Sequence, residues 1–284
     1  MELEYVSYVV GKPNATEENA RKFDLTYSVP IKVKFRLKKY KNPDSPPTIF
    51  EKEINFCNIP YMTKSGGFII NGNDRVIINQ MHRSPGVIFE EGEEHEVTKY
   101  GNQVFHARII PYRGAWVEFE FDYDNALIVI IDRRKKFPAT VLLRALGLET
   151  DEEIVLAVSP DPDIQSELLP SLQQAQAIST VEDALDFIGS RVAIGQVRES
   201  RIERARQLLD KYFLPHIGTD SSEETRRKKA LFLGQMACKL IELVLGRRGV
   251  DDKDHYANKR LKLAGDLLAM LFRSAFRGFV RDLR

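Results

Sequence analysis

Apolar and polar residues alternate along the first half of the chain in the way expected of half-buried strands. The first such segment places Lys32, Lys34 and Arg36 on one face of its strand. Two others are joined at Asn71-Gly72, a pair that readily takes the positive φ angles of a tight turn. The predicted strands are residues 26–37, 50–56, 67–70, 75–81, 104–110, 116–121 and 127–132.

From Asp132 onward the apolar residues recur at the spacing of helices. Pro138 suits the first turn of a helix that runs to about Leu146, and Gly147 stands where a helix stop is expected. Thr180 is expected to cap the next helix, whose buried stripe comprises Val181, Ala184, Leu185 and Ile188. Further helices are predicted near residues 198–212, 225–245 and 256–280. The stripe of the last helix is expected to be core and comprises Leu267, Leu268, Leu271, Phe272, Ala275, Phe276 and Phe279.

This order of elements predicts an α+β fold with segregated strands and helices. A chain of 284 residues can form two domains, and the boundary is expected near residues 90–102. An antiparallel, β-rich portion would precede a mixed domain that has strands and one helix to about residue 150 and a helical array over 178–284. The acidic residues at the boundary are expected to form a solvated linker and comprise Glu90, Glu91, Glu93, Glu94 and Glu96.

The overall charge does not point to a nucleic-acid-binding protein, because 42 Lys and Arg residues face 41 Asp and Glu residues. Any such role must come from local clusters of charge. Cys57 and Cys238 are the only cysteines, which fits a reducing compartment and predicts a cytoplasmic protein. No apolar run is long enough for a membrane span, and no leader peptide is expected.

Motifs for catalysis are absent from the sequence, so we expect no catalytic residue, bound metal or cofactor in this chain. The best metal candidate is the run from Asp251 to His255, which has three carboxylates in four positions. The alternative is favoured: Asp254 and His255 would start the following helix, whose N-terminus attracts negative charge.

Two features suggest nucleic-acid contact. After Asp132 comes a run of four cations that could face a phosphate track or could simply be a solvated face, namely Arg133, Arg134, Lys135 and Lys136. Trp116 is the single tryptophan and could stack on a base, or it could be a core residue at a domain seam. Arginines at 198, 201, 204 and 206 are interleaved with glutamates and are expected to be solvated.

Several blocks of the sequence resemble the β (second-largest) subunit of multisubunit DNA-directed RNA polymerases. The front blocks resemble bacterial subunits and include Arg83-Ser84-Pro85-Gly86 within 66–87, Arg113-Gly114-Ala115-Trp116 within 107–116, and Asp132-Arg133-Arg134-Lys135-Lys136 within 131–147. The rear blocks, at 181–189, 213–218 and 251–265, resemble the lobe of archaeal and eukaryotic subunits. Two origins fit this mixture, a natural subunit with an archaeal-like helical insert or a constructed fusion.

The resemblance implies part of the protrusion domain at residues 1–92 and the lobe domain at 93–284. It also implies a place in the jaw of the DNA cleft, next to the non-template strand and the downstream duplex. By position, Arg83, Trp116, Asp132 and Arg133 match residues of a pocket that receives a flipped non-template guanine. Arg75, Ile78 and Gln80 match the border of the rifamycin pocket. The family's catalytic Mg²⁺ belongs to the largest subunit.

The leading hypothesis is therefore a non-catalytic, DNA-contacting fragment of a DNA-directed RNA polymerase, a nucleotidyltransferase. Its expected contacts with DNA are Arg83, Trp116, Asp132, Arg133, Arg134 and Lys135, and its expected partners are DNA and the other polymerase subunits. The alternative is a docking surface for initiation or elongation factors, formed by the acidic segment 90–96 and the lobe helices. A stand-alone enzyme is the third hypothesis, and no motif favours it.

Overall fold

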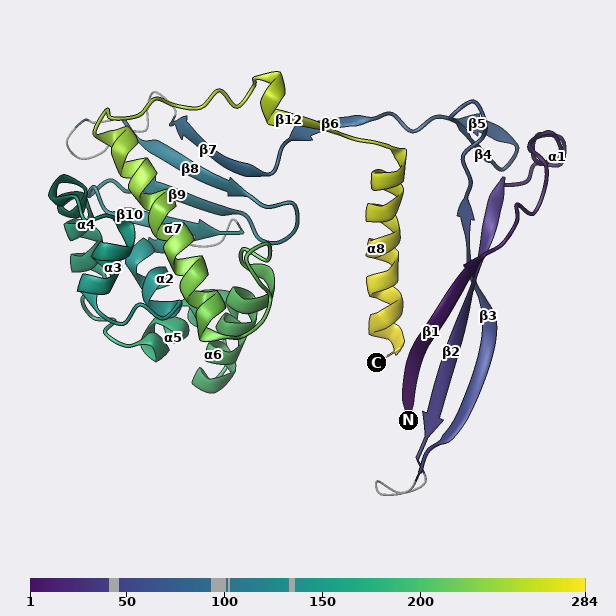
Figure 1. Cartoon of the computed structure of the whole chain (residues 1–284), viewed down its shortest axis with the longest axis horizontal. Coiled ribbons are helices and arrows are strands. Elements are labelled where there is room, and N and C mark those ends of the chain that lie inside the picture. Colours follow the sequence, from purple (N-terminus) through teal and green to yellow (C-terminus); the bar gives the residue numbers. More distant parts are fainter. Residues whose placement is uncertain (41–45, 93–100, 102, 133–135, 284) are drawn as a thin grey trace. The chain divides into compact units, whose positions relative to one another are not determined.

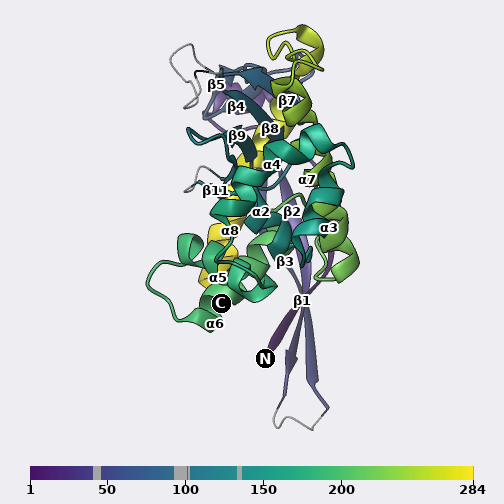
Figure 2. The same ribbon diagram turned by 90° about the vertical axis from the view of Figure 1, so that its left-hand side faces the viewer.

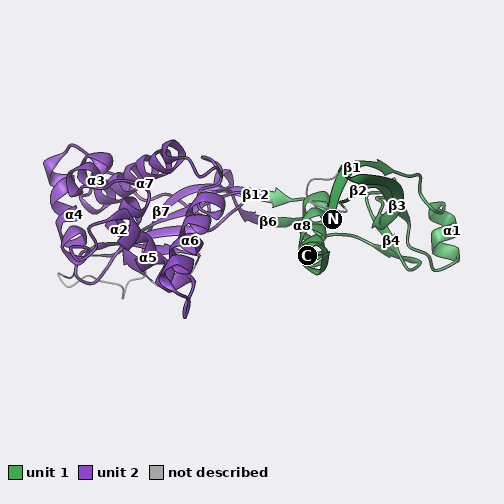
Figure 3. Ribbon diagram, turned by 90° about the horizontal axis from the view of Figure 1, so that it is seen from below, with its two compact units in different colours: residues 1–81, 261–284 green, residues 82–260 purple. Residues whose placement is uncertain are grey.

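The computed structural model describes residues 1–40, 46–92, 101, 103–132 and 136–283. Its contacts divide the chain into two compact units (Figure 3): unit 1 is residues 1–81 with 261–284, and unit 2 is residues 82–260. The chain therefore crosses between the units twice. The strands at the two crossings, β6 (Gln80–Arg83) and β12 (Lys259–Lys262), pair in a two-stranded sheet. Antiparallel sheets and helices in both units confirm the predicted α+β fold.

Unit 1 is built on a three-stranded antiparallel sheet in the order β1-β2-β3. The predicted basic face of β2 is confirmed, since Lys34 and Arg36 both bind the carboxylate of Glu51. Lys34 Nζ lies 2.6 Å from Oε2, and Arg36 Nη2 lies 2.6 Å from Oε1. A short helix and a short hairpin complete the N-terminal part of this unit. Its elements are β1 (Glu2–Val10), α1 (Glu17–Lys22), β2 (Ser28–Lys39), β3 (Thr48–Pro60), β4 (Phe68–Ile70) and β5 (Asn73–Arg75).

The predicted Asn71-Gly72 turn is confirmed, with φ angles of 49° and 76° at the two residues. The strand that follows is shorter than expected, because β5 ends at Arg75 after three pairs with β4. Arg21 of α1 binds the Asp74 carboxylate with its Nε and Nη2 atoms and so ties the helix to the hairpin.

The continuous helix predicted at 256–280 is wrong. A 3₁₀ turn, η2 (Tyr256–Asn258), is followed by strand β12, and only then does helix α8 (Ala264–Leu283) begin. The prediction that its apolar stripe is core is wrong as well, since Leu271 is 68% exposed and Phe276 is 42% exposed. Phe276 and Phe279 reach the ring of Phe56 on β3, at 6.2 and 5.3 Å between centroids. These two contacts leave most of the stripe uncovered.

Unit 2 contains a five-stranded antiparallel sheet in the order β11-β10-β9-β8-β7. The predicted strands at 104–110, 116–121 and 127–132 are confirmed. The linker predicted at Glu90 and Glu91 is wrong, because both residues belong to a strand; Glu93, Glu94 and Glu96 lie outside the described residues. The strands are β7 (Gly86–Glu91), β8 (Phe105–Ile110), β9 (Val117–Phe121), β10 (Leu127–Ile131) and β11 (Phe137–Pro138).

The helices of unit 2 confirm most of the caps and stops predicted from sequence. Gly147 has a φ of 102° after the first helix, and the Thr180 side chain accepts a hydrogen bond from the backbone N–H of Asp183. Two helices were not predicted, although Thr150 and Glu153 form a capping box before the first of them. The helices are α2 (Ala139–Ala145), α3 (Asp151–Val158), α4 (Pro162–Gln174), α5 (Val181–Val192), α6 (Arg198–Gln207), the π-helical η1 (Leu208–Tyr212) and α7 (Glu223–Val244).

Helices α2, α4 and α7 contact the strands of this sheet (Figures 1 and 2). The core forms between these layers from alternate strand residues such as Phe119 and Val129 and from helix residues such as Leu142 and Leu240. The opposite face carries charged side chains on β7, β8 and β9, such as Glu90, Arg108 and Glu120. Among the described helices, none has the length and apolar content needed to cross a membrane.

The compact units do not divide at the limits expected from sequence. A boundary between residues 92 and 93 would separate β7 from β8, yet these two strands pair along their whole length from Gly86↔Ile110 to Glu91↔Phe105. The last residues of the chain, in α8, group with unit 1. The protrusion and lobe limits at 1–92 and 93–284 refer to a whole polymerase and stay a prediction.

Candidate nucleic-acid interface

Trp116 and Asp132 meet at one end of the unit 2 sheet. Trp116 comes just before β9 and Asp132 just after β10, and the register pairs Val117 with Ile131. The backbone N–H of Asp132 donates to the Trp116 carbonyl at 2.9 Å. Asp132 has a φ of 51°, in the left-handed region. The Trp116 side chain is 37% exposed and is therefore not a core residue of unit 2.

The loop before Trp116 is fixed by the helical part of the same unit. The backbone N–H of Ala115 donates to the carbonyl of Tyr212 at 3.0 Å. Gly114 has a φ of 117°, and a Cβ atom there would lie 2.6 Å from the Tyr212 carbonyl and 2.8 Å from Pro215 Cδ. Only glycine fits this approach. The indole is thus carried by backbone that is anchored on both sides.

The face of the sheet opposite the helices carries a network of charges. Strand alternation puts Trp116 on the same side as Glu118 and Glu120. Burial alone would raise the pKa of Glu120. The hydrogen bonds from His106 and Lys136 outweigh burial, so the pKa of Glu120 lies below its ordinary value. Charged residues therefore surround the strand that presents the tryptophan.

Arg83 belongs to a cluster around Glu90, which is only 8% exposed. Glu90 Oε1 lies 3.6 Å from Arg83 Nη1 and 2.5 Å from Arg108 Nη1, and Glu90 Oε2 lies 2.9 Å from Lys253 Nζ. Burial favours the neutral form of Glu90. The hydrogen bond from Lys253 and the charges of the three cations outweigh that effect and hold the pKa of the carboxyl below its ordinary value.

Lys253 reaches this cluster because the segment before η2 runs along the free edge of β7. Asp251 and Phe89 exchange two hydrogen bonds, from the Asp251 N–H to the Phe89 carbonyl at 2.8 Å and from the Phe89 N–H to Asp251 Oδ2 at 3.0 Å. The Arg248 guanidinium stacks over the Phe89 ring at 4.2 Å. The sequence analysis missed Lys253 as a site residue, since no spacing rule relates it to a glutamate so far away in the chain.

The predicted base pocket is brought together only in part. Trp116 and Asp132 are bonded neighbours, whereas Arg83 makes no cation–π contact with Trp116 among the described residues and instead faces Glu90. Three of the predicted contacts lie outside the described residues, namely Arg133, Arg134 and Lys135. The fourth cation of that run, Lys136, forms an ion pair with Glu120.

The predicted rifamycin-border residues belong to unit 1. Arg75 ends β5 opposite Phe68, and Gln80 begins β6. Ile78 lies between the two strands and is 85% exposed. All three side chains face solvent in the described structure, and their role in drug binding stays a prediction.

The metal candidate at residues 251–255 does not converge. The Asp252 carboxylate accepts the backbone N–H groups of Asp254 and His255, and the Asp254 carboxylate pairs with Lys259 at 2.9 Å. Within the described part of the chain, no group of three or more His, Cys, Asp or Glu residues is arranged to hold a metal ion.

Comparison with known proteins gives one family and a set of related subunits. The family model described as RNA polymerase Rpb2, domain 2, matches residues 83–262, which nearly coincide with unit 2. The chain is 44% identical to DNA-directed RNA polymerase subunit Rpo2 of Saccharolobus shibatae, an alignment that covers 96% of this chain and 27% of that subunit. It is 40% identical to subunit Rpo2N of Halobacterium salinarum, over 77% of this chain and 42% of that one.

A third relative is DNA-directed RNA polymerase subunit beta of Geotalea daltonii, which is 42% identical over 69% of this chain and 14% of that subunit. The likeness to the Saccharolobus subunit runs through both halves of the chain, because its alignment covers 96% of it. The chain spans about a quarter of the length of that relative.

Proposed function

This chain belongs to the family described as RNA polymerase Rpb2, domain 2, and from that premise we propose that it is a non-catalytic, DNA-contacting part of a DNA-directed RNA polymerase. It would serve transcription in the cytoplasm together with the other polymerase subunits, with nucleotidyl transfer and its Mg²⁺ located in the largest subunit. Residues 1–92 would belong to the protrusion and 93–284 to the lobe. Together they would form part of the jaw of the cleft, against the non-template strand and the downstream duplex.

The observation that carries the proposal is the exposed indole of Trp116 on an anchored backbone. Aromatic rings that are partly exposed and rigidly held offer a stacking platform for an unpaired base. The Gly114 approach and the Asp132 hydrogen bond hold Trp116 in this way on both sides. A base that leaves a melted duplex would find the ring already positioned.

Charge on the same sheet face supports phosphate contact. Four cations form ion pairs with three buried or half-buried carboxylates. The cations are Arg83, Arg108, Lys136 and Lys253, and the carboxylates are those of Glu90, Glu118 and Glu120. Arg133, Arg134 and Lys135 follow Asp132 in the sequence and add three cations. Cations that neutralise backbone phosphates release counterions condensed on the DNA, and this release favours binding.

The test is fluorescence anisotropy of the whole 284-residue chain with labelled single-stranded and forked DNA at several salt concentrations. Affinity should fall as salt rises. Trp116→Ala should weaken binding to single-stranded DNA by roughly tenfold or more, the loss expected for one base–aromatic stack. Trp116→Phe should retain most of the affinity, because a ring remains.

Tyr123→Ala is the matched control, since Tyr123 is also an exposed aromatic residue but lies in the β9–β10 turn at the other end of the sheet. Its affinity for DNA should stay within about twofold of the parent chain. Binding that is insensitive to salt, or an equal loss in the two alanine variants, would contradict direct contact through Trp116.

A second candidate function is a docking surface for initiation or elongation factors. Ile194 and Val197 favour it, because both are largely exposed in the loop between α5 and α6. Ile194→Asp should abolish pull-down of a purified initiation factor and leave DNA binding unchanged. Glu90 cannot take part as a free acidic residue, since three cations already engage it.

A further inference from the structure

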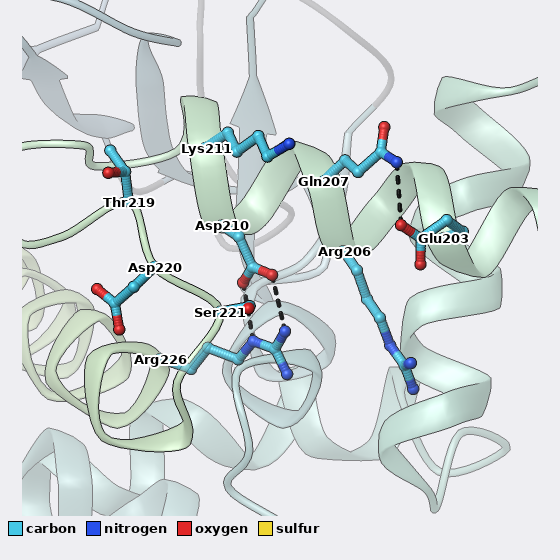
Figure 4. A pocket seen from close by; sticks show the side chains of 9 residues that line it. All are labelled: Glu203, Arg206, Gln207, Asp210, Lys211, Thr219, Asp220, Ser221 and Arg226. Carbon is cyan, nitrogen blue, oxygen red and sulfur yellow. Dashed lines mark hydrogen bonds and ion pairs between the residues drawn. The ribbon is translucent and has the colours of Figure 1, made fainter. Parts of the chain in front are cut away.

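A pocket of about 600 Å³ lies in unit 2 between the end of α6, the π-helical η1 and the loop before α7 (Figure 4). Its volume is in the range of small-molecule sites. The residues that line it are all polar or charged and are Glu203, Arg206, Gln207, Asp210, Lys211, Thr219, Asp220, Ser221 and Arg226. No residue proposed above to contact DNA is among them.

One wall of this pocket is a built feature of the fold. π-Helical turns are rare and occur often at functional sites. In η1 the widened turn is held by Lys229, a fully buried residue of α7 whose Nζ donates to the carbonyls of Leu209 and Asp210 at 2.8 and 2.9 Å. Burial lowers the pKa of the Lys229 ammonium, because burying a charged group is unfavourable. The two hydrogen bonds to η1 are therefore formed at the expense of this desolvation.

The carboxylates of the pocket already have partners. Asp210 accepts two hydrogen bonds from Arg226, at 2.8 and 2.7 Å. Asp220 accepts from the hydroxyls of Ser222 and Thr225, and these bonds lower its pKa to about 2. Glu203 accepts from the Gln207 side-chain amide at 2.9 Å, as Figure 4 shows. Their acceptor capacity is therefore largely used within the protein.

Several side chains that can donate hydrogen bonds are left without partners. Within the described part of the chain, the Arg206 side chain forms no hydrogen bond or ion pair, and its Nε is shielded from solvent. Lys211, Thr219 and Ser221 likewise have no side-chain partner among the described residues. In Figure 4 the Arg206 side chain extends below the α6–η1 ribbon, whereas Arg226 reaches up to Asp210. A ligand that satisfies this set must be rich in acceptors.

We propose that this pocket binds a phosphate-bearing anion, with Arg206 as its main contact and the Thr219 and Ser221 hydroxyls as further donors. A guanidinium presents paired N–H groups whose geometry matches phosphate oxygens. The lining has three cations against three carboxylates, and Lys229 behind the wall adds a fourth cation. The volume exceeds one phosphate group and fits a diphosphate or nucleoside polyphosphate. The shared chemistry is the phosphoryl group, supplied by a free ligand or by a nucleic-acid backbone.

The experiment is isothermal titration calorimetry of the whole chain with inorganic pyrophosphate, a nucleoside triphosphate and a short single-stranded DNA. Arg206→Ala should weaken binding of at least one phosphate ligand by about tenfold or more, the loss expected for a charge-assisted contact. A loss confined to pyrophosphate and triphosphate identifies a free ligand, and a loss confined to DNA identifies a backbone phosphate.

Arg204→Ala is the matched control, because Arg204 is an exposed arginine on the same helix and does not line the pocket. It should change affinity by less than about twofold. Equal losses in both variants, or no binding of any of the three probes at millimolar concentration, would overturn the proposal. Trp116→Ala should leave pyrophosphate binding intact, so failure here is distinct from failure of the DNA-contact function.

Arg206 has no partner to lose, so Arg206→Ala should fold and melt like the parent chain when followed by circular dichroism. Should it melt early, Ser221→Ala removes a donor from the other side of the pocket and should weaken the same ligand a few-fold. Arg206→Lys keeps the charge without the paired N–H geometry and should give an intermediate affinity. Full affinity in both Arg206 variants would contradict the assignment.

Discussion

Unit 2 and unit 1 differ sharply in how much apolar surface they bury. In unit 2 a continuous set of buried side chains runs from Phe89 on β7 to Leu243 on α7, between a sheet and its helices. In unit 1 the buried apolar side chains among the described residues are few, namely Ala20, Val29, Val33, Phe68, Ile69 and Ala264. Strand β1 has none. Two packed layers make a core, and one sheet with a partly covered helix does not.

This contrast shows what an amphipathic pattern does and does not determine. Helix α8 has a clear apolar stripe, yet Phe272 and Phe279 are exposed, while α5 has a similar stripe whose Leu185 and Ile188 are buried. Periodicity identifies the face that is available for packing. Whether another layer covers that face depends on the rest of the fold. Unit 2 should therefore hold most of the stability of the chain.

The largest expected effect comes from the same substitution made in each unit. Phe119→Ala removes a ring that is 1% exposed in the core of unit 2 and should cost about 3–5 kcal/mol of unfolding free energy. Phe276→Ala removes a ring that is 42% exposed on α8 and should cost about 1 kcal/mol. Urea unfolding would measure both values.

The single tryptophan makes the two units separable in that experiment. Trp116 belongs to unit 2, so its fluorescence reports on unit 2, whereas far-UV circular dichroism reports on both units. The Phe119 variant should shift the fluorescence transition and the Phe276 variant should leave it in place. A shift of that transition in the Phe276 variant would show that the two units unfold as one and would contradict the comparison.

A smaller effect is expected from neighbouring lysines on α7 that differ only in burial. Lys229→Met leaves the buried carbonyls of Leu209 and Asp210 without a donor. The substitution also removes the cost of burying an ammonium group, which offsets part of this effect. The free energy of unfolding should still fall by about 2 kcal/mol. Lys228→Met removes one exposed ion pair with Glu224, which solvent screens, so it should change stability little. The fluorescence transition of Trp116 measures both. If the Lys229 variant were as stable as the Lys228 variant, Lys229 would have no structural role at η1.

Local chemistry made much of this fold predictable from sequence. The Asn71-Gly72 turn, the stop at Gly147 and the Thr180 cap depend on neighbours in the chain, and all three are confirmed. Strand β7 was missed because Glu90 interrupts an apolar pattern, and its charge is tolerated only through cations that come from elsewhere in the sequence, including Lys253.

The candidate site divides in the same way. Trp116 and Asp132 could be placed together because they flank two strands of one hairpin, whose register follows from its turn. The partner of Arg83 could not be predicted, since Glu90 faces it only after the chain bends between β6 and β7. Contacts that depend on tertiary folding leave no periodic signal in the sequence.

The smallest effect concerns the pH dependence of stability, and it too separates the units. The pKa of Glu90 is lower in the folded chain than its ordinary value of 4.5, because three cations outweigh its burial. Its contribution to stability is therefore complete above that value and is lost as the pH falls through the folded pKa. Glu90→Gln should lower the unfolding free energy at about pH 7, and the difference from the parent chain should shrink by about pH 3.

Glu51 on β3 of unit 1 is the control, since hydrogen bonds from Lys34 and Arg36 also lower its pKa but its carboxylate is open to water. Solvent screens such a pair, so Glu51→Gln should change stability little at either pH. Urea unfolding at the two pH values gives all four numbers. Glu51→Gln could instead prove as costly as Glu90→Gln at neutral pH. Burial would then not explain the contribution of the Glu90 cluster to stability, and the two units would not differ in the strength of their ion pairs.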